Sequence, residues 1–131
     1  MKHVKFFENQ QDKVYVFTIS ESWVEIYIKI FRDKESAENY ILYYVNTEFR
    51  DNENAQNVLR DDFEDYYIDY CIKKDKEILF LDPKIAMEFY NTQNAPPFRS
   101  TRKEMKVTIY NAETFIDKEL EIYLNAKKYN L

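Results

Sequence analysis

The chain has 131 residues, which fits a single domain over residues 1–131. It contains no glycine, which excludes the usual forms of phosphate-binding loops, dinucleotide-binding turns and hydrolase nucleophile elbows, because these need backbone that approaches a ligand closely or turns sharply. A net charge of −5 argues against nucleic acid as the principal ligand. The single cysteine excludes an internal disulfide and a cysteine-based zinc site, and the single histidine excludes a multi-histidine metal site within one chain.

Three stretches near the N-terminus are rich in Val, Ile, Phe and Tyr, which is typical of β-strands: residues 3–8, 13–19 and 23–30. Short polar joints separate them, so we expect an antiparallel meander. Because the chain offers no glycine, we expect Asn or Asp at any turn that needs a positive φ.

Two amphipathic helices should follow the meander. Asp33 is a candidate N-cap, and apolar side chains recur at three-and-four spacing over residues 34–49. The same spacing over residues 54–65 predicts a second helix, which carries much of the acidic surface.

Residues 66–73 fit two patterns. The tyrosines at 66, 67 and 70 continue the helical stripe, whereas alternation of aromatic and β-branched residues is typical of a strand. The β propensity of these residues favours the strand. With Glu77–Leu81 it would form a hairpin that turns through residues 74–76.

The last third of the chain begins with a strong helix start, because Asp82 offers an N-cap and Pro83 suits the first helical position of a short helix to about residue 90. Residues 91–101 contain Asn-Ala-Pro-Pro and are predicted to be a long loop.

A final strand over residues 104–110 and a closing helix over 112–128 complete the predicted elements. Strands, then helices, then strands again indicate an α+β fold with a mainly antiparallel sheet and about four helices.

The most acidic part of the chain is the segment Glu48–Asp69, which we call the acidic segment. It holds eight carboxylates and two arginines, a net charge of −6 in a chain whose total is −5. As one continuous helix it would be about 33 Å long, with one carboxylate per roughly 4 Å, close to the phosphate spacing of about 3.4 Å along a DNA strand.

This pattern predicts a surface that mimics nucleic acid toward a basic protein partner, such as a nuclease or a nucleic-acid-binding complex, with no direct contact to nucleic acid. It is also typical of an ordinary solvated helix face. The candidate partner-binding residues are Glu53, Asp61, Asp62, Glu64, Asp65, Asp69, Tyr66, Tyr67 and Tyr70.

Two other functions remain open. Asp69 on a hairpin strand, followed by an apolar strand and then Asp82 and Lys84, matches the spacing of metal-dependent nucleases of the restriction-endonuclease type, although Pro83 favours a helix start at that point. The many tyrosines would also suit a homodimer contact in a structural or assembly protein.

A smaller basic cluster follows the proline-containing loop and has two interpretations, a nucleic-acid contact or a solubilising loop. Its residues are Phe98, Arg99, Arg102, Lys103 and Lys106.

The run from Phe31 to Tyr40, which follows the predicted meander, resembles a strand-to-helix junction in small phage and mobile-element accessory proteins, anti-CRISPR inhibitors among them. The resemblance implies a short, acidic, non-enzymatic protein that binds and blocks a host nuclease or nucleic-acid-binding complex. It transfers no functional residue, because such inhibitors share no common motif.

The chain starts without the apolar run of a secretory signal, and no apolar run reaches the length of a membrane span. We therefore expect a soluble, cytoplasmic protein that needs no cofactor.

Overall fold

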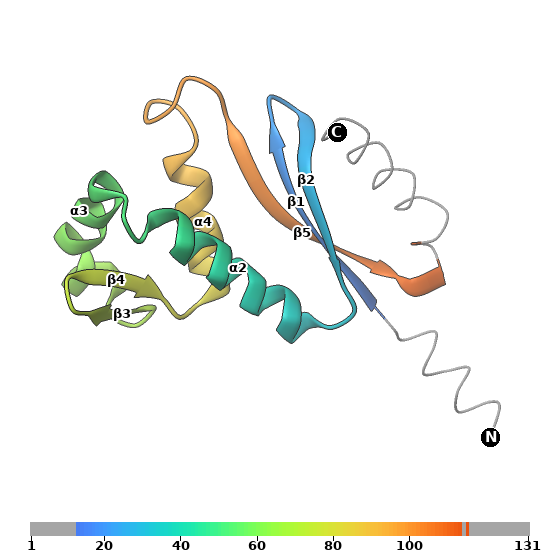
Figure 1. The fold of residues 1–131 in the computed structure, drawn as a ribbon, viewed down its shortest axis with the longest axis horizontal. Helices are drawn as coiled ribbons and strands as arrows, with labels where there is room; N and C mark the ends of the chain where they lie inside the picture. Colours follow the sequence, from blue (N-terminus) through green and yellow to red (C-terminus); the bar gives the residue numbers. More distant parts are fainter. Residues whose placement is uncertain (1–12, 114, 116–131) are drawn as a thin grey trace. The chain divides into compact units, whose positions relative to one another are not determined.

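The computed structural model describes residues 13–113 and Phe115. Its antiparallel sheets and helices confirm the predicted α+β class (Figure 1). In chain order, the described elements are β1 (Lys13–Glu21), β2 (Val24–Phe31), α2 (Lys34–Phe49), α3 (Glu53–Asp61), the π-helical turn η1 (Phe63–Tyr67), β3 (Cys71–Lys74), β4 (Glu77–Phe80), α4 (Pro83–Gln93) and β5 (Lys103–Asn111).

The described residues form two compact units. One comprises residues 13–37 with 101–113 and Phe115, and the other comprises residues 38–100. Helix α2 begins in the first unit and lies mostly in the second. That the whole chain is one domain stays a prediction.

The first unit is a three-stranded antiparallel sheet in the order β2-β1-β5, with Val16 opposite both Ile30 and Thr108. β1 and β2 confirm the predicted strands at 13–19 and 23–30, and β5 confirms the strand at 104–110. β5 occupies the edge of β1 opposite β2, where the meander had placed residues 3–8. Those residues and nearly all of the predicted helix 112–128 lie outside the described part of the chain.

The turn between β1 and β2 corrects two expectations. Trp23, predicted as a strand residue, is in the turn, and both turn residues have positive φ, 51° at Ser22 and 73° at Trp23. A two-residue hairpin needs left-handed backbone that matches the twist of its strands, and without glycine this turn uses a serine and a tryptophan instead of Asn or Asp. Asp75, with φ of 58°, meets the expectation in the β3–β4 hairpin.

Both helix-start predictions are confirmed by their caps. The backbone N–H of Ser36 donates to Asp33 Oδ1 at 2.7 Å at the start of α2, and the N–H of Ile85 donates to Asp82 Oδ1 at 3.0 Å at the start of α4. Pro83 is the first residue of α4, a position whose N–H has no hydrogen-bond partner within a helix, so the missing N–H of proline costs no helical hydrogen bond. α4 runs three residues past the predicted end at 90, which shortens the loop after it.

The predicted helix 54–65 and the predicted strand 66–73 are both displaced. α3 ends at Asp61, a wide turn of π-helix follows from Phe63 to Tyr67, and the strand begins only at Cys71. Helical periodicity thus prevails as far as Tyr67, and the β propensity of the tyrosines does not decide their conformation.

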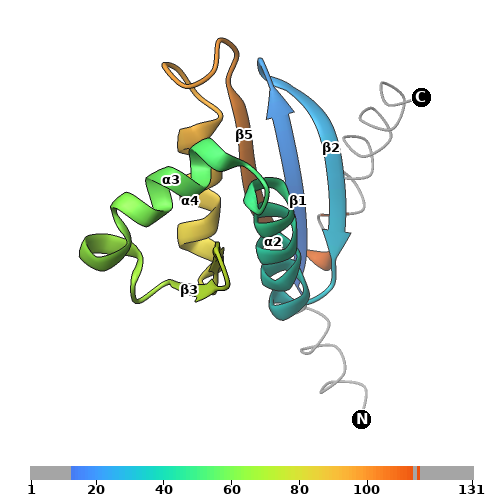
Figure 2. The ribbon, with the colours of Figure 1, turned by 60° about the vertical axis from the view of Figure 1, so that its left-hand side comes forward.

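Helices α3 and α4 and strand β3 belong to the second unit (Figure 2). The core of this unit is rich in aromatic side chains. The Phe89 ring lies 5.2 Å from Phe49 and 5.3 Å from Phe80, and the Tyr67 ring lies 6.0 Å from both Phe80 and Phe89. Such edge-on and tilted ring pairs stabilise by about 0.5–1.5 kcal/mol each beyond the area that they bury.

Two side-chain amides complete the free edge of β4. Asn46 on α2 exchanges two hydrogen bonds with the backbone of Phe80, at 2.8 and 3.1 Å. Gln56 on α3, only 4% exposed, accepts from the N–H of Ile78 at 2.8 Å and donates to the carbonyls of Ile78 and Phe49 at 3.2 and 2.9 Å. These amides take the place of a neighbouring strand, because buried backbone polar groups need partners.

Candidate functional site

The acidic segment is not one helix. It includes the end of α2, a break at 50–52, the nine-residue helix α3, the turn η1 and a second break before β3. The comparison with a rod of evenly spaced phosphates is therefore wrong for this segment, because each break changes the direction of the backbone.

The carboxylates of the acidic segment are nevertheless exposed and almost entirely without ion pairs. All eight carboxylate side chains are exposed, and within the segment one ion pair forms, Arg50–Asp51 at 4.0 Å. Arg60 donates to the Lys76 carbonyl and to Asn57, and Lys73 lies 4.4 Å above the Phe63 ring. Seven of the eight carboxylates therefore have no ion-pair partner among the described residues.

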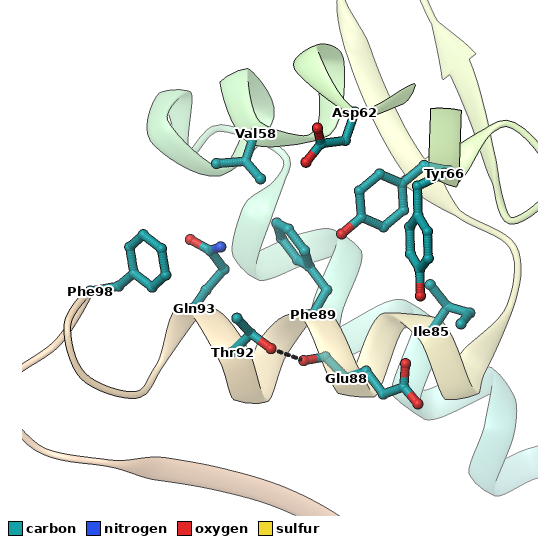
Figure 3. A pocket seen from close by; sticks show the side chains of 10 residues that line it. Val58, Asp62, Tyr66, Ile85, Glu88, Phe89, Thr92, Gln93 and Phe98 are labelled. Carbon is teal, nitrogen blue, oxygen red and sulfur yellow. Dashed lines mark hydrogen bonds between the residues drawn. The ribbon is translucent and has the colours of Figure 1, made fainter. Parts of the chain in front are cut away.

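A pocket of about 310 Å³ opens beside this charge, within the second unit (Figure 3). Two helical faces line it. The first face runs from α3 to η1 and consists of Val58, Asp62 and Tyr66, which are four residues apart in the sequence. The second face is one side of α4, whose lining side chains are three or four residues apart. The α4 side chains are Ile85, Glu88, Phe89, Thr92 and Gln93.

The wide turn brings two tyrosines to this pocket. The carbonyl oxygen of Asp62 accepts from the N–H of Tyr66 at 2.9 Å and from that of Tyr67 at 3.3 Å. In a regular α-helix the Asp62 carbonyl would accept only from Tyr66, four residues later in the chain. The additional π-type bond from Tyr67, five residues later, holds the side chains of both tyrosines at the pocket. The two rings meet edge to face with their centres 4.7 Å apart.

Tyr67 is the inner of the two tyrosines. Burial, together with the neighbouring Tyr66, Asp62, Cys71 and Glu88, raises its pKa to about 12. Its hydroxyl is therefore protonated at neutral pH and can donate a hydrogen bond.

The remaining predicted contact residues lie around this pocket or farther away. The Tyr70 ring is 6.0 Å from that of Tyr66. Asp61, Glu64, Asp65 and Asp69 are exposed on the stretch from the end of α3 to β3. Glu53 begins α3, about 12 Å along the helix axis from Asp61. The structure therefore brings together Asp62, Tyr66 and Tyr67 and leaves Glu53 apart.

Several pocket residues were not predicted from the sequence. Glu88 and Phe89 lie far from the acidic segment in the chain and reach it because α4 packs beside α3 and η1. Phe98, which was predicted only as part of the basic cluster, follows α4 and also lines the pocket. The three-and-four spacing of the α4 side chains was visible in the sequence, but it indicates a helix face and not what that face contacts.

The residues of the nuclease alternative lie near the base of the β3–β4 hairpin. The N–H of Leu81 donates to the carbonyl of Tyr70 at 2.7 Å. Asp69 and Asp82 are therefore the sequence neighbours of two residues that are hydrogen-bonded to each other. The Asp82 carboxylate caps α4, and Lys84 is exposed on that helix. In the part of the chain that the structure describes, no three His, Cys, Asp or Glu side chains are grouped so that they could hold a metal ion.

The single cysteine is buried at the start of β3. Burial, together with the charge of Asp82, raises the pKa of the Cys71 thiol to about 12. The thiol therefore stays protonated at neutral pH and is a poor nucleophile.

The basic cluster is divided, because Phe98 and Arg99 belong to the second unit and Arg102, Lys103 and Lys106 to the first.

No protein-family model, curated protein sequence or solved structure matches this chain. No helix in the described residues has both the length and the apolar composition needed to cross a bilayer.

Proposed function

We propose that the protein is a non-enzymatic inhibitor, of the kind found in phages and mobile elements, that binds a basic protein surface of a host nucleic-acid-handling complex. The contact surface consists of the exposed carboxylates between Asp61 and Asp69 together with the tyrosines beside them. Charge accelerates the encounter and fixes the orientation of the partner, and the aromatic side chains slow its release.

The observation that carries the proposal is the concentration of uncompensated carboxylates beside partly exposed aromatic rings. Exposed carboxylates with no ion pair in the described residues are available to a partner's cations without first losing an internal bond. Tyr66 is 50% exposed and Ile68 is 54% exposed, so apolar surface lies within the charged stretch. Tyrosine among charged groups is a composition typical of the energetic centre of an interface.

Capture from an extract of the native host, followed by mass spectrometry and reconstitution, tests this function. We expect the tagged protein to retain a complex with a basic nucleic-acid-binding groove, and a stoichiometric amount of it to block DNA or RNA binding by that purified complex. A captured partner with an acidic contact surface, or one that still binds nucleic acid at saturation, would contradict the proposal. Capture of the same chain alone would indicate the homodimer alternative.

The nuclease alternative provides the control for this experiment. A titration with magnesium in the presence of labelled DNA and RNA should give no cleavage by the purified chain. The Asp82→Asn variant should inhibit the partner as strongly as the wild type, because Asp82 lies outside the proposed contact surface and asparagine keeps the oxygen that caps α4. Magnesium-dependent cleavage that Asp69→Asn and Asp82→Asn each abolish would replace the inhibitor with an enzyme built on Asp69, Asp82 and Lys84.

A further inference from the structure

We infer that the pocket between α3, η1 and α4 receives one aromatic side chain of the partner, and that basic residues on either side of this side chain lie against the carboxylates at the edges of the pocket. This inference rests on the proposed function, because it names the chemistry that the partner presents to the same surface.

The middle of the pocket is apolar. Phe89, only 4% exposed, lies in the centre of the lining, and the half-buried side chains of Val58 and Ile85 line it from α3 and α4 (Figure 3). The hydroxyl of Thr92, which also belongs to the lining, already donates to the carbonyl of Glu88 at 3.0 Å. An apolar group can therefore enter without leaving this hydroxyl unpaired.

Rings at both ends of the lining favour an aromatic side chain. Tyr66, which is 50% exposed, meets Tyr67 edge to face, and Phe98, which is 61% exposed, lies at the opposite end of the pocket (Figure 3). A ring that enters between these ends can form further edge-to-face or offset pairs, which stabilise beyond the area that they bury. A volume of about 310 Å³ is at the small end of ligand pockets, which suits one side chain better than a whole cofactor.

The backbone of η1 is an independent reason to assign binding to this pocket. Turns of π-helix are rare and occur frequently at functional sites. Here the carbonyl of Asp62 accepts from the N–H groups of both Tyr66 and Tyr67, and both tyrosines line the pocket.

The charges at the edges of the pocket favour basic neighbours for the aromatic side chain. Figure 3 shows Phe89 and Tyr66 between the carboxylates of Asp62 and Glu88, so these two carboxylates need separate cations. Neither forms an ion pair within the described residues, and the negative end of the α3 dipole adds to the field at Asp62. A partner segment with a basic residue on each side of an aromatic one matches this order of charge, apolar surface and charge.

Binding of capped tripeptides to the full chain, followed by the NMR signals of the tyrosine rings, tests the inference without the partner. We expect acetyl-Lys-Phe-Lys-amide to shift the ring signals of Tyr66 and Tyr67 and to saturate in the millimolar range. Alanine in place of the phenylalanine should weaken binding at least about tenfold, because the ring is no longer buried. Leucine in its place should weaken binding about threefold, because it fills the pocket but forms no ring pair.

Probes of different charge test the basic neighbours. The uncharged acetyl-Ser-Phe-Ser-amide should bind about threefold more weakly than the lysine-flanked probe, since exposed ion pairs contribute little each. The glutamate-flanked counterpart should not bind, because its carboxylates would meet those of Asp62 and Glu88. Asp62→Asn should weaken the lysine-flanked probe about twofold and leave the affinity of the serine-flanked probe unchanged.

A variant outside the acidic segment locates the binding. Phe98→Ala should weaken the lysine-flanked probe about fivefold by removing one ring of the lining, and its side chain is exposed, so its loss should not unfold the chain. Tyr43→Ala is the matched control, because Tyr43 is a 65% exposed ring on α2 that does not line the pocket. This control should leave the affinity unchanged.

The possible failures are distinguishable. Equal binding of the phenylalanine and alanine probes, binding of neither, or an unchanged affinity in Phe98→Ala would overturn the aromatic pocket, while the inhibitor proposal stands on capture by the acidic segment. A leucine probe that binds as tightly as the phenylalanine probe would overturn the assignment to an aromatic side chain, and equal binding of the lysine-flanked and glutamate-flanked probes would overturn the basic neighbours. Ring signals that shift with protein concentration alone would assign the pocket to a second copy of the chain and overturn the inference. A confirmed pocket in a chain that captures no basic partner would leave the pocket and remove the proposed function.

Discussion

Replacing Asp61, Asp62 and Asp65 with lysine should abolish binding of the partner, with a loss of affinity of more than about a thousandfold, or 4 kcal/mol. The substitutions remove three attractive charges and place three repulsive ones against a basic surface, and like charges brought together across an interface cost several kcal/mol. Isothermal titration calorimetry with the reconstituted partner measures the loss.

The fold should tolerate this triple variant. All three side chains are exposed and none forms an ion pair in the described residues, and two of them lie at the C-terminal end of α3, where a cation interacts favourably with the helix dipole. Circular dichroism and thermal unfolding should therefore match the wild type.

A second triple variant separates local from total charge. Glu35→Lys, Glu104→Lys and Glu113→Lys change the net charge by the same amount at exposed positions of the first unit. We expect this variant to bind within about threefold of the wild type. Equal losses from the two variants would mean that total charge, and not the acidic segment, determines binding.

Gln56→Leu should lower the free energy of unfolding by about 3 kcal/mol, the largest effect expected from a single substitution. The leucine fills a similar volume but leaves the N–H and carbonyl of Ile78 without the partners that the amide gave them. The carbonyl of Phe49 loses the amide donor but still accepts from the N–H of Asn52 at 3.2 Å. Each buried backbone group left without a hydrogen bond costs about 1–3 kcal/mol, partly offset by the added apolar burial. Urea unfolding followed by far-UV circular dichroism measures the change.

Asn54→Leu is the matched control for Gln56→Leu. It makes an equivalent replacement of an amide on the same helix, at an exposed position, and should alter stability by less than about 0.5 kcal/mol. A Gln56→Leu variant as stable as this control would show that the edge of β4 does not need the amide.

The parts of the fold that local chemistry determines were predicted from the sequence. The caps at Asp33 and Asp82 and the apolar spacing after them are properties of neighbouring residues, and they gave α2 and the start of α4. The position of β5 beside β1 depends on pairing between residues about ninety apart, and no local pattern encodes it.

The conformation of the acidic segment was harder to predict because two local signals compete there. The tyrosines satisfy both a helical and a strand pattern, and the packing of Tyr67 against Phe80 and Phe89 decides between them. The turn between β1 and β2 was predicted, but the place of Trp23 in it and the positive φ of Ser22 and Trp23 were not, because strand pairing imposes positive φ on residues that do not favour it.

The candidate site was predicted in part. Asp62, Tyr66 and Tyr67 were selected for their charge and aromatic character, and they meet at one pocket. Glu88, which also lines the pocket, could not be selected, because the approach of α4 to α3 and η1 follows from helix packing and the neighbours of Glu88 in sequence form an ordinary amphipathic helix.

The dependence of partner affinity on salt tests the central claim most directly, since exposed carboxylates facing a basic surface attract through water and are screened by ions. We expect the dissociation constant of the wild-type complex to rise at least about tenfold between about 50 and 200 mM sodium chloride. A dissociation constant that stays within about twofold over this range would contradict an interface built on the acidic segment.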